Sequence, residues 1–276
     1  MILSLDLNDQ QYTFDTGESK DISIPLKFNG EQPNTYDVKR ASSEAYAADG
    51  FVGDTRQGGA CNFEQLTLTP HCNGTHTECI GHITNKRFSI QQQLKDSLIP
   101  ATLISVIPER AMDSTDHYSP DKEDRDVFIS REALQNALDS APRDCLKALI
   151  IRTLPNELSK KSRNYMKDEP SFLSLDAMRF IVSLGVEHLL IDLPSVDRLF
   201  DDGNLNAHHI FWNMKAGSHA ADQDSNVYKS ITEMIFVGDE IIDGSYVLNL
   251  QIAPLVSDAS PSRPIIYPLI KASKPV

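Results

Sequence analysis

A buried strand is predicted for Ala148-Leu149-Ile150-Ile151-Arg152-Thr153, the stretch that decides the fold class. A helix is then predicted between Ser174, which can cap its N-terminus, and Gly185, which can end it. Its apolar residues share one face: Ala177, Met178, Ile181 and Leu184. The next apolar stretch, His188-Leu189-Leu190-Ile191-Asp192, predicts a second buried strand. Strand, helix and strand in this order favour a βαβ unit with parallel pairing.

Further elements are predicted on the N-terminal side of this unit. Ser130 can cap a helix that runs through Leu134 and Leu138. Residues 101–107 form an apolar strand candidate, and residues 63–70 alternate between polar and apolar side chains, as a strand does.

Residues 21–26 also begin with alternation and then reach Pro25, which suits a short edge strand. The sequence shows no linker composition and no internal repeat. We therefore predict one α/β domain that spans residues 1–276.

Composition excludes several classes of protein. The chain has 276 residues, 40% of them apolar, and a formal charge of -13, which argues against binding to nucleic acid or to an anionic membrane. Residues 1–9 do not resemble a signal peptide, and no apolar run approaches the roughly 20 residues needed to span a bilayer. Four cysteines, at 61, 72, 79 and 145, fit no disulfide framework, so we expect a cytoplasmic protein with its thiols free or bound to metal.

The densest chemistry lies in residues 71–82, which read His-Cys-Asn-Gly-Thr-His-Thr-Glu-Cys-Ile-Gly-His. On an extended strand Cys72, His76 and Glu78 point to the same face, and together they make a plausible zinc or manganese site. His82 is a further ligand or a general base. The other interpretation is that these are unrelated polar residues of a loop.

A second group of polar residues follows in the C-terminal half. Residues 192–197 contain two aspartates directly after a predicted strand, and His208 and His209 come after a polar turn. Asp239, Glu240 and Asp243 surround a glycine further on. Taken separately, acidic residues beside glycine indicate turns, but together these groups could complete a site that begins at Cys72.

Several of these stretches resemble the family of cyclase-like metal-dependent hydrolases, which includes bacterial kynurenine formamidase and isatin hydrolase. Residues 73–76 with Glu78 and His82 are similar to the motif His-x-Gly-Thr-His-x-Asp-x-Pro-x-His of that family. Residues 21–26 resemble its N-terminal Asp-Leu-Ser strand, residues 190–208 its Asp-x-Pro-Ser-x-Asp…His segment, and residues 260–264 its Pro-x-Arg strand. The resemblance covers nearly the whole chain in the right order.

The chain departs from the family motif in ways that concern the metal. The first histidine of the motif falls on Cys72 and its aspartate on Glu78, while His71 lies one position early. The resemblance implies metal ligands, which we list as Cys72, His76, Glu78, His208 and Asp243. Glu240 is the second choice for Asp243, and His71 or His209 could replace another ligand. A thiolate is softer than imidazole and favours zinc over manganese.

The resemblance also implies an activity and a fold. The activity is hydrolysis of the C–N bond of an amide, either an N-formyl arylamine or a cyclic amide, by a metal-activated water with His82 as general base. The fold is a compact α/β domain with a mixed β-sheet core and flanking helices, of the swivelling β/β/α type. The expected assembly is a homodimer or homotetramer.

Two other classes of function remain open. Cys72 could be the nucleophile of a metal-free thiol hydrolase, with a histidine as its base. The departures from the motif could instead mark a degenerate member of the family that binds a ligand without turning it over. Metal content and ligand-dependent stabilisation discriminate between these classes.

Overall fold

The predicted βαβ unit forms the centre of a nine-stranded sheet in the computed structural model, which describes residues 1–139, 141 and 143–272. Strand β9 (Ile99–Val106), helix α3 (Arg131–Leu138), strand β12 (Ala148–Thr153), helix α4 (Leu175–Ser183) and strand β14 (His188–Ile191) follow one another along the chain. The strands pair in parallel, β12 with both β9 and β14. The strand and helix predictions for this part of the chain are confirmed.

The two predicted helix caps are also present. The hydroxyl oxygen of Ser130 accepts a hydrogen bond from the backbone N–H of Ala133 at 3.2 Å, and that of Ser174 from Ala177 at 2.9 Å. Gly185 follows the end of α4 with a φ of 78°, a left-handed conformation that favours glycine.

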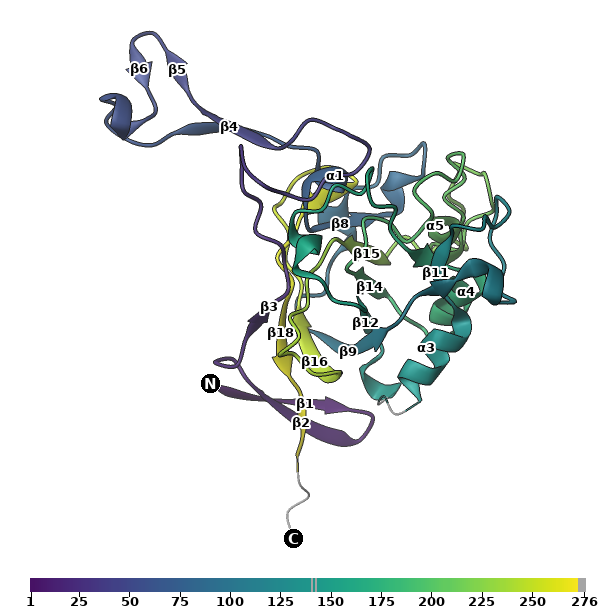
Figure 1. The fold of residues 1–276 in the computed structure, drawn as a ribbon. Helices are drawn as coiled ribbons and strands as arrows, with labels where there is room; N and C mark the ends of the chain where they lie inside the picture. The colour runs from purple at the N-terminus through teal and green to yellow at the C-terminus, as the bar shows by residue number, and fades with distance from the viewer. Residues whose placement is uncertain (140, 142, 273–276) are drawn as a thin grey trace.

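The sheet extends in both directions from this unit and curls as it does so (Figure 1). Its strand order is β17-β8-β15-β14-β12-β9-β16-β18-β3. Beyond β14, the strand β15 (Ser230–Glu233) pairs with it in parallel, β8 (His76–Cys79) pairs antiparallel with β15, and β17 (Ala259–Pro261) pairs antiparallel with β8. Beyond β9 come three antiparallel strands: β16 (Gly244–Asn249), β18 (Ile265–Pro268) and β3 (Lys20–Asp21). The α/β fold with a mixed sheet core is therefore confirmed.

Helices cover one face of the sheet and loops cover the other. Helices α3, α4 and α5 (Asn206–Phe211) lie together on one side in Figure 1. Alternate strand residues, among them Leu149, Ile151 and Leu189, pack into the core on that side. Ala148, Ile150 and Leu190 belong to the core on the opposite face. The central strands are thus buried on both faces, as expected for parallel strands.

Two of the predicted strands differ from expectation. Of residues 21–26, only Asp21 is in a strand, because β3 ends before Pro25, although it does lie at the sheet edge as predicted. Residues 63–70 contain β7 (Glu64–Thr67), but all four residues of this strand are exposed, and its partner is the equally short strand β4 (Ser42–Ala45). Its alternation therefore does not mark a core strand.

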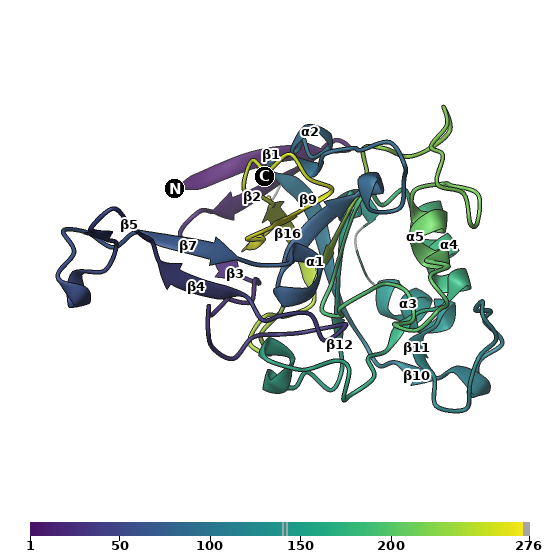
Figure 2. The same cartoon turned by 90° about the horizontal axis from the view of Figure 1, so that it is seen from above.

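The ribbon of β4 and β7, with β5 (Ala47–Ala48) and β6 (Phe51–Val52) at its tip, projects from the body as an arm (Figures 1 and 2).

A small sheet of β1 (Ile2–Leu7), β2 (Gln10–Asp15) and β19 (Ile270–Lys271) packs at the other end. A third small sheet combines β10 (Glu109–Arg110), β11 (Val127–Ile129) and β13 (Phe172–Leu173). The described residues also form the short α-helices α1 (Pro70–Asn73) and α2 (Ile90–Gln93). Within the described residues, no helix has the length and apolar character that crossing a membrane requires.

Candidate active site

Strand β8 forms the floor of a cluster of histidines and carboxylates. It lies between β15 and β17, and all four of its residues are buried. His76 and Glu78 alternate with Thr77 and share one face, as the period of a strand predicts. The buried side chains of His76 and Glu78 form the centre of the cluster, and the other site residues point toward them.

His71 reaches this point, whereas the sequence analysis placed Cys72 there. The expectation assumed an extended chain, but Pro70 begins the helical turn α1, and a turn reverses which neighbour faces the strand. Nδ1 of His71 lies 3.0 Å from Oε2 of Glu78. Cys72 belongs to none of the clusters of potential metal-binding atoms that the described residues form. Burial and the charge of Glu233 raise the pKa of its thiol to about 11.

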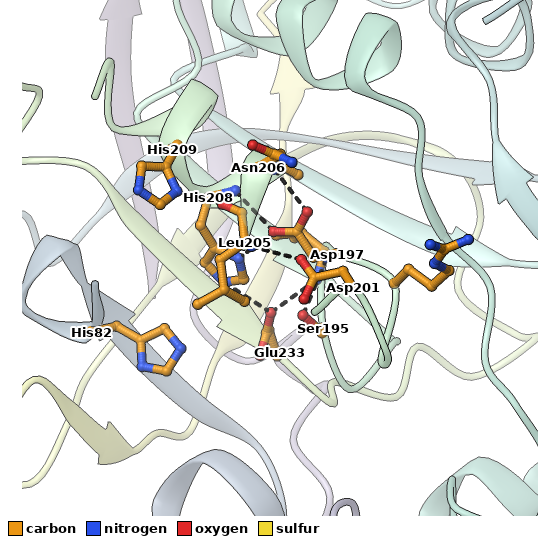
Figure 3. A network of polar contacts seen from close by, with 12 residues as sticks. His82, Ser195, Asp197, Asp201, Leu205, Asn206, His208, His209 and Glu233 are labelled. Atoms are coloured by element: carbon orange, nitrogen blue, oxygen red, sulfur yellow. Dashed lines mark hydrogen bonds and ion pairs between the residues drawn. The ribbon is translucent and has the colours of Figure 1, made fainter. Parts of the chain in front are cut away.

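His208 reaches Glu78 from the helical side of the sheet. Helix α5 starts after Leu205, whose φ of 46° is left-handed, and Asp197 receives the backbone N–H groups of Ala207 at 2.8 Å and His208 at 3.1 Å. The same carboxylate accepts a hydrogen bond from Nδ1 of His208 at 2.6 Å (Figure 3). Nε2 of His208 then lies 3.0 Å from Oε1 of Glu78.

The three imidazoles share one arrangement. Each directs one ring nitrogen toward the carboxylates at the centre and donates a hydrogen bond from the other nitrogen to a fixed acceptor. The acceptor is Asp258 for His71 at 2.9 Å, the carbonyl oxygen of Gly74 for His76 at 3.0 Å, and Asp197 for His208. Because the outer nitrogen keeps its proton in this hydrogen bond, the inner nitrogen is the one that can give up its proton and bind a metal ion, as in metal-binding histidines.

Glu233 completes the inner part of the cluster, and the sequence analysis did not identify it. Its Oε2 lies 3.4 Å from Nε2 of His76 and its Oε1 lies 3.8 Å from Nε2 of His208. It ends strand β15 directly opposite His76 and accepts a hydrogen bond from the backbone N–H of Val196 at 3.1 Å. No strand was predicted for residues 230–233, and only the pairing of β15 with β8 shows that Glu233 belongs to the site.

His82 lies at the rim of the cluster. Its side chain is 27% exposed, and its Nδ1 lies 3.6 Å from Oδ2 of Asp258 and 3.9 Å from Oε2 of Glu78. Figure 3 shows His82 and Glu233 on the same side of His208. Among the predicted site residues that reach the cluster, His82 has the most exposed side chain.

The structure does not bring Asp243, Glu240 or His209 to this cluster. Asp243 accepts hydrogen bonds from Oγ of Ser105 at 2.8 Å and from Arg152 at 3.0 Å. It precedes β16, which is separated from β8 by β15, β14, β12 and β9, so the sheet order corrects the expectation that it lies in the site. Glu240 is exposed in the same loop, and both ring nitrogens of His209 face backbone carbonyls, at 2.8 and 3.1 Å.

The charges of the cluster reinforce one another. Burial opposes ionisation of Glu78, but the charge of His82 and the contacts with His208 and His71 outweigh it and hold the pKa of Glu78 well below its usual range. Burial lowers the pKa of His71, but Asp258 and Glu78 outweigh this effect and raise it to about 10. The pKa of His208 is raised for the same reason, by Asp197 and Glu78. The site therefore holds carboxylates in their charged form, facing nitrogen donors.

Fold and site together define an α/β protein with a buried cluster of histidines and carboxylates at the edge of a mixed sheet. Residues 3–198, more than half of the chain, match the family model named Cyclase. The chain therefore belongs to the Cyclase family.

Known proteins similar to the chain agree with this placement. Kynurenine formamidase of Bacillus cereus is 28% identical over 260 residues, which cover 92% of this chain and 99% of the relative. Isatin hydrolase A from Labrenzia aggregata has the same fold, with a TM-score of 0.59, 15% identity, and coverage of 93% of this chain and 96% of that one. A predicted metal-dependent hydrolase from Bacillus stearothermophilus has a TM-score of 0.57, 16% identity, and coverage of 90% and 97%. The family resemblance expected from the sequence is confirmed.

Proposed function

We propose that this chain is a metal-dependent hydrolase that cleaves the C–N bond of an amide, of the N-formyl arylamine or cyclic amide type. The observation that carries the proposal is the common arrangement of His71, His76 and His208 around Glu78. The names of the similar proteins, kynurenine formamidase and isatin hydrolase, support the choice of reaction.

The residues present fit a divalent metal ion. In the part of the chain that the structure describes, Nε2 of His76 and Oε2 of Glu78 are buried and form no hydrogen bond of good geometry, and the partner of Oε2 is the ion-pair contact with His71 at 3.0 Å. Buried polar atoms without partners are costly, and an ion that binds both removes this cost. The nitrogen and oxygen donors of the site form groups whose atoms lie within 4.8 Å of one another. We propose His71, His76, Glu78, His208 and Glu233 as the residues that hold the ion.

This donor set leaves the metal identity open between zinc and manganese. Imidazole and carboxylate groups bind both, and the argument for zinc from a Cys72 thiolate does not apply once His71 replaces Cys72. When bound, the metal supplies a polarised carbonyl and a water of lowered pKa.

The remaining chemistry belongs to the side chains. His82 lies beside the cluster at the solvent rim, where it can take a proton from the attacking water and return it to the leaving nitrogen. Asp197 holds His208 in one orientation, and the carbonyl of Gly74 does the same for His76. Buried walls around Glu78 limit the access of bulk water and strengthen these electrostatic contacts.

The decisive experiment measures metal and activity on the same sample. Protein purified without chelator is analysed for metal content and assayed against N-formyl arylamines, lactams and lactones. We expect near-stoichiometric zinc or manganese, loss of amide hydrolysis on removal of the metal, and recovery when the ion is returned. Full activity in a preparation proven to be free of metal contradicts the proposal and favours the thiol hydrolase.

The same proposal covers assembly and location. From the family resemblance we propose a homodimer or homotetramer that acts on a small molecule in the cytoplasm. The four unpaired cysteines, three of them buried, are consistent with a reducing compartment. Light scattering that finds only single chains removes the oligomer from the proposal, and a disulfide found by non-reducing mass spectrometry counts against the location.

A further inference from the structure

We infer that Asp258 is a positioning residue for this reaction, because its carboxylate orients the imidazoles of both His71 and His82. The inference rests on the proposed function, in which His71 binds the metal and His82 is the general base. Asp258 lies outside residues 3–198, which match the family model, and outside the motifs that the sequence analysis identified.

One carboxylate oxygen faces two histidines. Oδ2 of Asp258 accepts a hydrogen bond from Nε2 of His71 at 2.9 Å and lies 3.6 Å from Nδ1 of His82. The two rings lie against each other at a tilt, with centroids 4.3 Å apart and an angle of 31° between their planes. The hydrogen bond to His71 is therefore formed, while His82 is close enough for a small side-chain movement to bring it into hydrogen-bonding range.

The backbone holds Asp258 in this place. Its carbonyl oxygen accepts a hydrogen bond from the backbone N–H of Cys79 at 3.0 Å, and the next residue, Ala259, lies opposite Glu78 in the sheet. Oγ of Ser257 donates a hydrogen bond to Oδ1 at 3.2 Å, which leaves Oδ2 for the histidines. A carboxylate attached to a paired strand in this way is a rigid acceptor.

The turn that carries His82 packs directly against Asp258. A Cβ atom on Gly81 would lie 3.1 Å from Cβ of Asp258 and 2.3 Å from the carbonyl oxygen of Phe88. Only glycine allows this approach of the two segments. The close contact fixes the distance between Asp258 and the ring of His82.

This geometry sets which nitrogen of each ring can react. Because Nε2 of His71 keeps its proton in the hydrogen bond to Asp258, Nδ1, the atom that faces Glu78, is the nitrogen that would give up its proton to a metal ion. A proton on Nδ1 of His82, facing Asp258, leaves Nε2 as the nitrogen that can accept a proton. When His82 becomes positively charged in the reaction, the carboxylate stabilises that charge. Asp258 thus acts through both rings and does not itself exchange protons with the substrate.

The test uses Asp258→Asn and Asp258→Glu, each in the wild-type and in the His82→Ala background. Asp176→Asn is the matched control, because Asp176 accepts a hydrogen bond from His117 at 2.9 Å outside the site. We measure kcat, KM, thermal midpoint, and metal affinity by competition with a chromogenic chelator. We expect Asp258→Asn to lower kcat and metal affinity each by about 10- to 100-fold, with KM changed less than about twofold. Asp258→Glu should recover part of the loss, and the control should lose nothing.

The double mutant separates positioning from a merely structural role. If Asp258 acts on kcat through His82, Asp258→Asn adds less than about threefold loss once His82 is alanine. Equal losses of kcat in both backgrounds with unchanged metal affinity overturn the inference, and so does an Asp258→Asn variant with wild-type kcat and metal affinity. In both cases the proposed function survives if chelation and His82→Ala still inactivate the enzyme. Full activity after both of those treatments refutes the proposed function instead.

Discussion

His76 and His82 lie six residues apart in the chain but have different roles in the proposed mechanism. His76 is fully buried with one unpartnered nitrogen, whereas His82 is at the rim. We expect His76→Ala to lose metal, because removal of one ligand weakens binding sharply. We expect His82→Ala to keep its metal and thermal midpoint while kcat falls by about a hundredfold to ten-thousandfold. Elemental analysis and steady-state kinetics measure both.

His117→Ala is the control for these two variants, because the side chain of His117 is 81% exposed and pairs with Asp176 outside the site. Loss of metal from His82→Ala as complete as that from His76→Ala shows that His82 is a ligand. Two fully active variants on a true substrate show that the cluster is not the catalytic site.

Cys72 tests the alternative thiol mechanism. With its pKa raised to about 11, the thiol is protonated near neutral pH and is a poor nucleophile. We expect Cys72→Ala to retain kcat within about threefold and to lose about 1 kcal/mol of unfolding free energy, as for a small buried side chain. Cys145→Ala, which removes another buried thiol, is the comparison. A Cys72→Ala protein with its metal intact and no activity supports the thiol hydrolase.

At the scale of residues, local periodicity predicted part of the site. His76 and Glu78 share a face because a strand has a period of two, and this rule needs no knowledge of the fold. Whether His71 or Cys72 faces Glu78 depends on the helical turn that begins at Pro70, because this turn directs His71 toward the site in place of Cys72. Glu233 and Asp258 could not be predicted, because they enter the site through pairing with a strand more than a hundred residues earlier in the chain.

At the scale of elements, the caps of α3 and α4 give a prediction of stability. The hydroxyl oxygen of Ser130 caps α3 by accepting a hydrogen bond from the backbone N–H of Ala133. The hydroxyl group of Ser174 caps α4 in the same way, through Ala177, and also donates a hydrogen bond to Asp116 at 2.6 Å. We expect Ser130→Ala to cost about 1 kcal/mol of unfolding free energy and Ser174→Ala about 2 kcal/mol. Urea denaturation with an unchanged slope measures both losses. Equal losses show that the bond to Asp116 adds nothing.

The elements that could be predicted are those with strong local signals. The apolar strand at 148–153, the capped helix after Ser174 and the strand that follows lie where the sequence places them. The arm strand β7 shows the limit of this reasoning, because alternation also occurs in a ribbon exposed on both faces. Alternation reports the backbone conformation, whereas burial depends on what the rest of the chain provides.

At the scale of the whole molecule, we expect the bound metal to stabilise the fold. Without an ion, Glu78 and Glu233 lie buried in the same cluster, and their charge is compensated by the histidines and, for Glu233, by the backbone N–H of Val196. Removal of the metal should therefore lower the thermal midpoint, and return of zinc or manganese should restore it in proportion to RT ln(1 + [L]/Kd). Calorimetry of the two forms measures the change, with the Glu78→Gln variant as the control that should not respond. An identical midpoint with and without the ion contradicts the proposed ligand set.

The pairing of β8 also has a consequence for protein synthesis. Residues 76–79 are synthesised more than a hundred residues before their two neighbouring strands, at 230–233 and 259–261. Until then this strand has no partner on either edge, and contacts so distant in sequence form slowly. The nascent chain therefore carries an unpaired strand and an incomplete ion-binding pocket until both of these strands have been made. Cellular chaperones are expected to matter more for the yield of this protein than the stability of its finished fold suggests.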